Sequence, residues 1–323
     1  MNRMSKRILL GAGLAAGVVA AAAASYAVTK KMVTVALDRK MPKVPGSKKT
    51  LTGSEDVLAL LRMQEEAAKK LENSGCQTVE ITAYDGVHLI GHLYRCENAK
   101  RTVIAMHGWR SSWLNDFGII SEFMFQNQCN VLFAEQRGQG QSGGDYMGFG
   151  MIERHDCLYW ISWIGQQDFA ALPIYLVGVS MGASTVLMTA GFDLPDTVKG
   201  IIADCGFTSA HEIWKYVTES NLPLLYTGLR GELANDICRR KIQFGSKDYS
   251  CIDALQTGKT PVLFIHGTDD KFVPIEMTYE NYKACVAPKR LFIVPGAEHG
   301  LSYVVDKAGY EAAVKRFWRE FDN

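Results

Sequence analysis

A serine between two glycines lies in the middle of the chain. The continuously apolar run Ile174–Val179 leads into Gly178-Val179-Ser180-Met181-Gly182, and a helical stretch, Ala183–Ala190, follows. A serine on a sharp turn from strand to helix holds its hydroxyl exposed at strained backbone angles, and neighbouring glycines let the chain and a substrate approach closely. The pattern predicts Ser180 as a nucleophile toward acyl carbonyls; an idle serine in a glycine-rich turn is the alternative.

The negative charge that develops during acyl chemistry requires hydrogen-bond donors. A helix directs its first N–H groups toward the residue that precedes it, which favours an oxyanion there. The residue after the nucleophile supplies one such N–H group in this kind of turn. We therefore expect the backbone of Met181 to form half of an oxyanion hole.

A general base for Ser180 is expected among seven histidines. His299 lies on a loop after the last predicted strand, and imidazole can accept the serine proton and later protonate a leaving group. His107 and His266 each precede a glycine at a strand end and are expected to be structural, although His107 could instead shape the oxyanion loop. The remaining four are expected to be structural or solvent-facing: His88, His92, His155 and His211.

An aspartate would orient this histidine, and two adjacent candidates exist. Asp269 and Asp270 both follow the predicted strand Pro261–Ile265. Position alone leaves either of them able to serve as the acid, because the three groups need to meet only in space.

Five motifs in a fixed order give the chain a family resemblance. They are Met106-His107-Gly108-Trp109, the run Glu135–Gly143 that contains Arg-Gly-x-Gly-x-Ser, the turn at Ser180, His266–Pro274, and Gly296–Gly300. Residues 78–321 resemble the α/β-hydrolase superfamily and, within it, the membrane-anchored bacterial relatives of the Bem46-like hydrolases. The order serine, aspartate, histidine is that of the superfamily.

The resemblance implies roles that the residues alone leave open. The family pattern G-x-x-D-x-x-V, counted from Gly267 to Val273, implies Asp270 as the acid and leaves Asp269 a role in the turn. It also places the second oxyanion donor after His107-Gly108, which implies the backbone N–H group of Trp109. The expected catalytic set is therefore Ser180, Asp270 and His299.

Strand-like and helix-like segments alternate from residue 78 onward and would position these groups. Thr78–Tyr84 and Val87–Tyr94 are joined by Asp85-Gly86, which predicts a hairpin. Short apolar runs separated by helical stretches then predict strands buried on both faces of a parallel sheet. These runs are Thr102–Met106, Asn130–Ala134, Ile174–Val179, Gly200–Ala203, Pro261–Ile265 and Arg290–Val294. The expected fold class is α/β, an α/β-hydrolase fold with a mostly parallel, doubly wound sheet.

One interval is too long for a simple connection. Residues 207–258 carry their own aromatic and leucine residues, which predicts a helical cap insertion over the site. The domain from 78 to 323 would thus contain the sheet and this cap. An apolar acyl or aryl group is the expected ligand of such a cap, although its side chains could simply pack on the domain.

The N-terminal segment predicts a membrane anchor. Ile8–Val28 is an uncharged, mostly apolar run between basic residues, long enough as a helix to cross a hydrocarbon core of about 30 Å. We expect residues 1–31 to be a retained signal anchor; a cleaved signal peptide and a soluble helix are the alternatives. The basic residues before the run favour a catalytic domain outside the cytoplasm, whereas Lys30, Lys31 and further basic residues oppose that orientation. Residues 32–77 are expected to form a linker, Met41–Thr52, and a lead-in helix, Glu55–Leu71.

Composition excludes several other classes of function. The net charge is +1, so nucleic acid is not an expected partner. Eight scattered cysteines form no C-x-x-C pair; free thiols, mostly buried, are expected, with a disulfide among the later ones as the alternative. No zinc site is expected, and no cofactor either, because no P-loop, no H-E-x-x-H and no G-x-G-x-x-G opening a helix after the first strand occurs.

These features predict a serine hydrolase that cleaves a small-molecule ester or related acyl bond through an acyl-enzyme, in the manner of carboxylesterases. Acyl transfer to another acceptor, peptide hydrolysis, and binding without catalysis on the same fold are the alternatives.

Overall fold

The computed structural model describes residues 3–41, 55–221, 226 and 228–322, with side chains described from residue 20 and, after the first gap, from residue 58. Eight strands form one sheet in the order β1-β2-β4-β3-β5-β6-β7-β8. Their bounds are β1 Gln77–Thr82, β2 His88–Tyr94, β3 Arg101–Met106, β4 Cys129–Ala134, β5 Ile174–Val179, β6 Val198–Asp204, β7 Val262–Gly267 and β8 Lys289–Val294. The first two strands are antiparallel to their neighbours and β3 to β8 run parallel, so the predicted mostly parallel sheet is confirmed.

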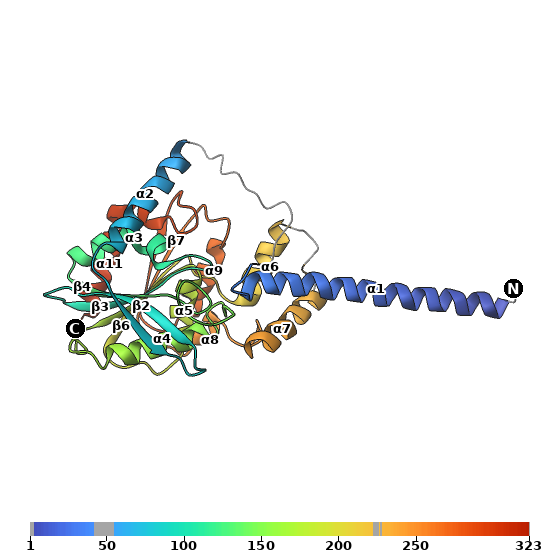
Figure 1. Ribbon diagram of the computed structural model, residues 1–323. Helices are drawn as coiled ribbons and strands as arrows, with labels where there is room; N and C mark the ends of the chain where they lie inside the picture. Colours follow the sequence, from blue (N-terminus) through green and yellow to red (C-terminus); the bar gives the residue numbers. More distant parts are fainter. Residues whose placement is uncertain (1–2, 42–54, 222–225, 227, 323) are drawn as a thin grey trace.

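Helices cover both faces of the sheet (Figure 1). On one face lie α2 (Glu55–Glu72), α3 (Trp113–Gln126), α10 (Ser302–Val305) and α11 (Lys307–Phe321). On the other lie α4 (Glu153–Ile164), α5 (Met181–Thr189), α8 (Cys251–Leu255) and α9 (Ile275–Ala284). Each face therefore has its own apolar core, as the continuous apolar strand patterns require.

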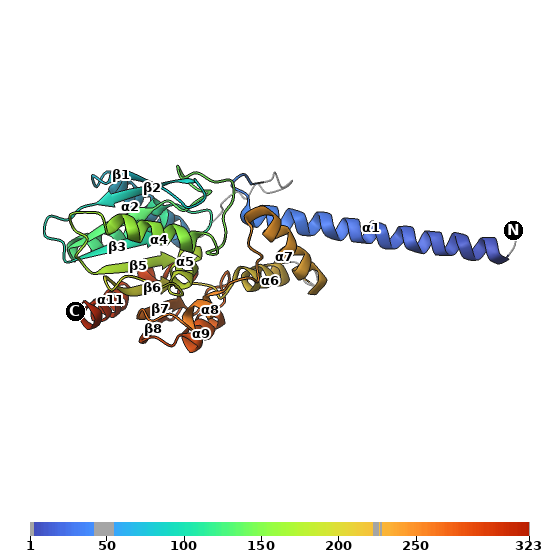
Figure 2. The same ribbon diagram turned by 90° about the horizontal axis from the view of Figure 1, so that it is seen from below.

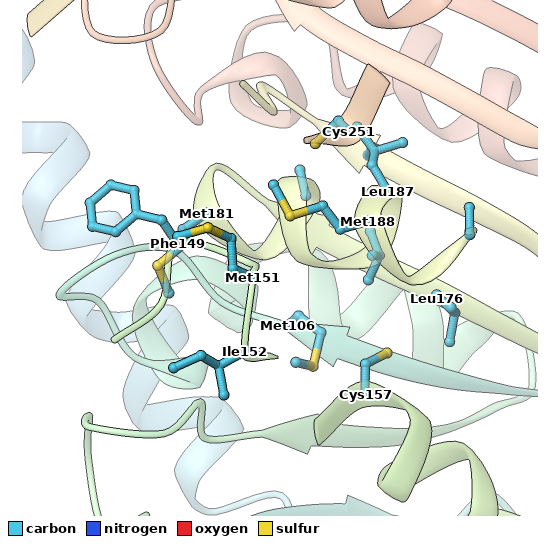
Figure 3. Packing of buried hydrophobic residues seen from close by; sticks show 14 of the residues in the cluster. Met106, Phe149, Met151, Ile152, Cys157, Leu176, Met181, Leu187, Met188 and Cys251 are labelled. Atoms are coloured by element: carbon cyan, nitrogen blue, oxygen red, sulfur yellow. The ribbon is translucent and has the colours of Figure 1, made fainter. Parts of the chain in front are cut away.

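The alternation of side chains along a strand explains how one run of residues supplies both cores. In β3, Val103 and Ala105 point to the core with α3, whereas Ile104 and Met106 point to the core with α5. Figure 3 shows this second core, where Met181, Leu187 and Met188 of α5 gather beside Met106 and Leu176 of the sheet. The packing fixes the start of α5, and hence the turn that precedes it, against the strand ends.

Between β6 and β7 the chain forms α6 (Ala210–Asn221), α7 (Gly228–Ile242) and α8, all within the predicted insertion at 207–258. The C-terminal part of α1 (Arg3–Leu37) lies beside α6 and α7 in both views (Figures 1 and 2). We call α6, α7 and residues 25–39 the cap layer. From there α1 extends away from the domain toward the N-terminus.

The expected anchor Ile8–Val28 falls within α1, and its side chains up to residue 19 lie outside the described residues. Among the residues that the structure describes, no helix combines the length and the apolarity that a membrane crossing needs. The helix continues to Leu37, beyond the expected anchor and up to four residues before the expected linker. Most of the expected linker Met41–Thr52 lies outside the described residues.

All eight cysteines are free thiols, and six of them are buried. The expectation of buried free thiols is confirmed for these six.

Candidate active site

Ser180 occupies a strained turn between β5 and α5. Its backbone angles are φ 55° and ψ −118°, a conformation that side chains rarely adopt. The Ser180 N–H group donates to the Asp204 carbonyl at 2.9 Å, which ties the turn to the end of β6. Both glycines are required by close packing: a Cβ atom at Gly182 would lie 1.8 Å from the Met106 carbonyl oxygen, and one at Gly178 would lie 2.2 Å from the Gly182 carbonyl oxygen. This is the local reason for the Gly-x-Ser-x-Gly pattern.

His299 and Asp270 complete a chain of hydrogen bonds from the serine. The Ser180 Oγ and His299 Nε2 atoms are 2.9 Å apart, and His299 Nδ1 and Asp270 Oδ2 are 2.7 Å apart. The three residues follow β5, β8 and β7, so they meet at the carboxyl edge of the parallel sheet, where α/β proteins place their sites. The structure thus brings together the three side chains that the sequence predicts.

The Asp270 carboxylate is fixed from several sides. Its Oδ1 atom accepts from the backbone N–H groups of Phe272 and Val273, each at 2.9 Å, and its Oδ2 atom lies 3.1 Å from His266 Nε2. Burial alone would raise the pKa of Asp270, but the hydrogen bonds from His266 and His299 and the backbone donors together lower that pKa well below its ordinary value. Asp270 is therefore a carboxylate that accepts from His299 at every pH near neutrality.

The neighbouring Asp269 has no part in this chain of hydrogen bonds. It is exposed, and its carboxylate accepts from the Thr268 hydroxyl at 2.8 Å. The geometry favours Asp270 over Asp269 as the partner of His299.

The two expected oxyanion donors flank Ser180. Met181 is the first residue of α5, and the loop that carries Trp109 follows β3. This loop touches the serine closely, because a Cβ atom at Gly108 would lie 3.3 Å from the Ser180 Cβ atom. The Gly108 N–H group in turn donates to Asp116 Oδ2 at 2.6 Å.

His107 orients the peptide that carries the Trp109 N–H group. Its Nε2 atom accepts from the Gln136 N–H group at 3.1 Å, and its Nδ1 atom lies 2.9 Å from the Gly108 carbonyl oxygen, so Nδ1 carries the proton. Burial lowers the pKa of His107 although Asp116 opposes this, and the ring is accordingly neutral. The Gly108 C=O and Trp109 N–H groups belong to one planar peptide and point in opposite directions, so fixing one fixes the other. These contacts favour the second of the two roles considered for His107, namely that it shapes the expected oxyanion loop.

Sequence reasoning missed several residues that position the predicted ones. His266 was expected to be only structural, yet it lies against Asp270; Asp116 and Gln136 were not singled out at all. The contact of His266 with Asp270 could have been predicted, since His266 directly follows the predicted strand and precedes Asp270 by only four residues.

Cys205 is a further neighbour that the sequence did not mark. Its sulfur lies within 4.8 Å of ligand-type atoms of Asp270 and His299. Burial raises the pKa of this thiol well above its ordinary value, so it is protonated, and the other two groups already bond to each other. Cys205 therefore packs against Asp270 and His299 as a neutral side chain, and we assign no metal to these three residues.

A cavity of about 380 Å³ opens over these groups. Ser180, His299, Trp109 and Phe272 line it. Polar side chains from α2, from the loop before α3 and from the start of α3 also line it, namely Gln64, Ser111, Asn115 and Asp116, as do apolar side chains that include Phe117, Ile119, Ile120 and Val304. We call it the catalytic cavity. Its size is within the range of about 300–1,000 Å³ that is typical of small-molecule sites.

Comparison with known proteins identifies the family and the fold of the chain. The model of the prolyl oligopeptidase family matches residues 115–321, which is more than half of the chain and includes Ser180, Asp270 and His299. The YqkD protein of Bacillus subtilis (strain 168) is 28% identical over 254 residues, which cover 78% of this chain and 81% of YqkD. The YfhR protein of Escherichia coli (strain K12) is 25% identical over 229 residues, 69% of this chain and 73% of YfhR.

Among solved structures, the esterase PF2001 of Pyrococcus furiosus has a TM-score of 0.64 at 21% identity, with 87% of this chain and 97% of the esterase covered. This likeness shows the same fold. The narrower resemblance to Bem46-like hydrolases stays a prediction. The matched family model and the shared fold lead to one conclusion: the chain belongs to the prolyl oligopeptidase family and is a serine hydrolase of the α/β-hydrolase fold.

Proposed function

We propose that this protein is a carboxylesterase in which Ser180, His299 and Asp270 act as a catalytic triad. The observation that carries the proposal is the unbroken chain of hydrogen bonds, 2.9 Å and 2.7 Å long, that starts at a serine in a strained turn. The same arrangement of nucleophile, base and orienting acid defines serine hydrolases on unrelated folds.

The first half-reaction follows from the positions of these groups. The Ser180 oxygen attacks the carbonyl carbon of the ester while its proton passes to His299 Nε2. The carbonyl oxygen becomes an oxyanion, which the backbone N–H groups of Met181 and Trp109 would stabilise. When the intermediate collapses, the bond to the alcohol oxygen breaks and the alcohol leaves with the proton from His299. An acyl-enzyme remains.

Water completes the cycle in the second half-reaction. His299 takes a proton from the water, the resulting hydroxide attacks the acyl carbon, and the acid leaves as Ser180 regains its proton. Asp270 accepts from Nδ1 throughout, which keeps the proton off Nε2 in the resting enzyme and stabilises the imidazolium when it forms.

Esters are the proposed substrates because the structural neighbours include several esterases, among them Est1E of Butyrivibrio proteoclasticus, which was solved with ferulic acid and has a TM-score of 0.58. Peptide hydrolysis is the second candidate, since the matching family model is that of prolyl oligopeptidase. Acyl transfer is the third, and the residues of the site do not separate it from hydrolysis.

The test uses the full-length protein and its Ser180→Ala variant on p-nitrophenyl esters, peptide p-nitroanilides and a fluorophosphonate probe. We expect ester hydrolysis and probe labelling by the wild type, and a loss of both, by at least about 10³-fold in rate, in the variant, with unfolding temperatures nearly unchanged. Undiminished hydrolysis by Ser180→Ala would disprove the mechanism. Cleavage of anilides but not esters would make the protein a peptidase, and absence of labelling would leave a binding protein on this fold.

We also propose that α1 anchors the enzyme in a membrane with the catalytic domain outside the cytoplasm. The support is the uncharged run Ile8–Val28 and the basic residues before it. The full chain should then resist carbonate extraction from membranes, and a chain without residues 1–24 should be soluble. Release of the full chain by carbonate would contradict the anchor, and protection of its domain from protease in spheroplasts would contradict the orientation. The cut is placed before Ser25 because the cap layer begins there: the Ser25 hydroxyl oxygen accepts from Arg230 Nε at 3.0 Å.

A further inference from the structure

A second cavity, of about 390 Å³, lies between α1, α6 and α7. We call it the apolar cavity, because nearly all side chains around it are hydrocarbon or aromatic. Its walls include Val33 and Ala36 of α1, Trp214 and Val217 of α6, Ala234 of α7, and Phe149. The polar groups at its boundary are Lys31, Thr218 and the buried Trp214 indole N–H group, which has no hydrogen-bond partner among the described residues. The Tyr226 hydroxyl is already bonded to His211 Nδ1 at 3.0 Å.

The two cavities share part of their walls. Trp109 and Phe272 line both of them, so a single layer of side chains separates the apolar cavity from Ser180 and His299. The Phe272 ring lies 5.0 Å from the His299 ring, edge to face, and is more than a third exposed. The two cavities are therefore adjacent, with Trp109 and Phe272 between them.

Residues of α1 are built into this wall rather than lying loosely over it. Val33 and Leu37 are 1% and 0% exposed. The Ala36 carbonyl accepts from Trp109 Nε1 at 2.8 Å, and the Val35 and Asp38 carbonyls accept from the Arg110 guanidinium at 2.8 and 2.7 Å. The segment that leads to the expected anchor thus fixes the indole that stands between the two cavities.

The position of His299 distinguishes the two ends of an ester. The leaving alcohol must take its proton from His299 Nε2, so it belongs in the catalytic cavity, which contains that ring. The acyl chain and the alcohol oxygen are different substituents of the reacting carbon, so the chain leaves that carbon in another direction. The apolar cavity touches Trp109 but neither Ser180 nor His299, and it offers a long hydrocarbon chain a surface with few polar groups.

We propose that the apolar cavity binds the acyl chain, so that the substrate is an ester of a fatty acid and residues 28–36 of α1 are part of the substrate site. This inference rests on the proposed esterase function. A hydrocarbon chain is the occupant that the lining favours, because each methylene transferred from water into such a cavity contributes about a fourfold gain in binding. A polar or charged acyl group would lose its hydration there and find few partners, namely the Trp214 indole N–H group and, at the boundary, Lys31 and Thr218.

The test compares two series of esters hydrolysed by the full-length protein in one detergent. The first series, p-nitrophenyl esters from acetate to dodecanoate, varies the acyl chain; the second, acetates of linear alcohols, varies the leaving group. In the first series kcat/KM should rise by about fourfold for each methylene until the cavity is full. The second series should respond far less to chain length.

Two matched variants of α1 distinguish an effect of filling the apolar cavity from an effect of placing a bulky side chain anywhere on the helix. Ala36 lines the cavity, whereas Ala27 is exposed and outside its lining. Ala36→Phe should lower the ratio of kcat/KM for decanoate to that for acetate by at least about tenfold, the equivalent of roughly two buried methylenes. Ala27→Phe should leave this ratio within about twofold of the wild type. Met32→Ala, which removes bulk from the wall, should move the optimum toward longer chains.

Two measurements serve as controls for each variant. The unfolding temperature shows whether the variant is folded, and labelling by the fluorophosphonate probe shows whether Ser180 is still reactive. Equal ratios in Ala36→Phe and Ala27→Phe would overturn the assignment, as would a change confined to the alcohol series. A wild type that cleaves esters without chain-length dependence would refute the acyl site and leave the esterase standing. A wild type that cleaves no ester would refute both.

Discussion

The catalytic cavity and the apolar cavity meet at Trp109 and Phe272, yet they are assembled in different ways. Ser180, His299 and Asp270 are joined by hydrogen bonds, and each lies in the turn or loop that follows a strand of the sheet. The apolar cavity instead brings Val33 of α1, near the start of the chain, against Trp214 and Ala234 of α6 and α7, which belong to the insertion between β6 and β7. Short-range turns define the reacting groups, whereas long-range packing of helices defines the space beside them.

This difference has a consequence for substitutions. A change in the catalytic cavity should alter the rate with every ester alike, since every ester uses the same nucleophile, base and donors. A change in the apolar cavity should alter the dependence of the rate on chain length. The two effects can be measured on the same ester series.

The largest effect is expected for Asp270→Asn. An amide in place of the carboxylate can donate to His299 Nδ1 and so stabilise the tautomer with the proton on Nε2, which cannot accept from Ser180. We expect kcat to fall by about 10³–10⁴-fold for short and long acyl chains alike. Steady-state rates over the ester series measure it.

Asp269→Asn is the matched control, because Asp269 is exposed and bonds to Thr268. It should keep kcat within about twofold, as surface substitutions usually do. If Asp269→Asn were the more damaging of the two, the assignment of the acid would be wrong.

Much of this architecture follows from the sequence. The observed strands overlap all eight predicted runs, and β5 has the predicted bounds, because buried parallel strands are short apolar runs that turn residues interrupt. The hairpin also has the predicted turn, since Gly86 adopts φ 83°. The serine, the histidine and the choice of Asp270 each depend on a motif that lies within ten residues.

The role of α1 could not be predicted in the same way. A run of apolar residues ending in lysines has the same pattern whether it crosses a membrane or packs on a cap. Nothing near Ala36 or Val33 in the sequence indicates Trp109, Trp214 or Ala234 as neighbours. The role of His107 was underestimated for a similar reason, since its partner Gln136 follows a different strand.

A smaller effect is expected for His107→Ala. Removing the ring frees the Gly108 carbonyl, so the peptide that carries the Trp109 N–H group, the proposed second oxyanion donor, loses this restraint. Loss of a whole donor costs about 10²–10³-fold in kcat, so loss of its orientation should cost about 10–100-fold with KM little changed. Pre-steady-state measurement of acylation with the acetate and decanoate esters would show the same factor for both.

His107→Asn provides the control for this effect, because an asparagine side chain can donate to the Gly108 carbonyl as Nδ1 does. It should recover part of the lost kcat. A KM increase shared by both variants, with kcat intact, would indicate that His107 only supports the fold.

The smallest effect concerns stability in acid and involves the Asp270 carboxylate, which bonds to His299 of the catalytic cavity. The pKa of Asp270 is lowered in the folded protein, so its carboxylate contributes stability that is complete above the unfolded value of about 3.9 and is lost as the pH falls toward the folded value. The unfolding temperature of the wild type should therefore fall more steeply between about pH 5 and 3 than that of Asp270→Asn, by a few degrees. Calorimetry of the wild type, Asp270→Asn and Ala36→Phe across this pH range compares the catalytic residues with the apolar cavity. The Ala36→Phe protein should keep the wild-type slope, because its cavity contains no acid; equal slopes in wild type and Asp270→Asn would mean that the fixed carboxylate adds nothing to the stability of the fold.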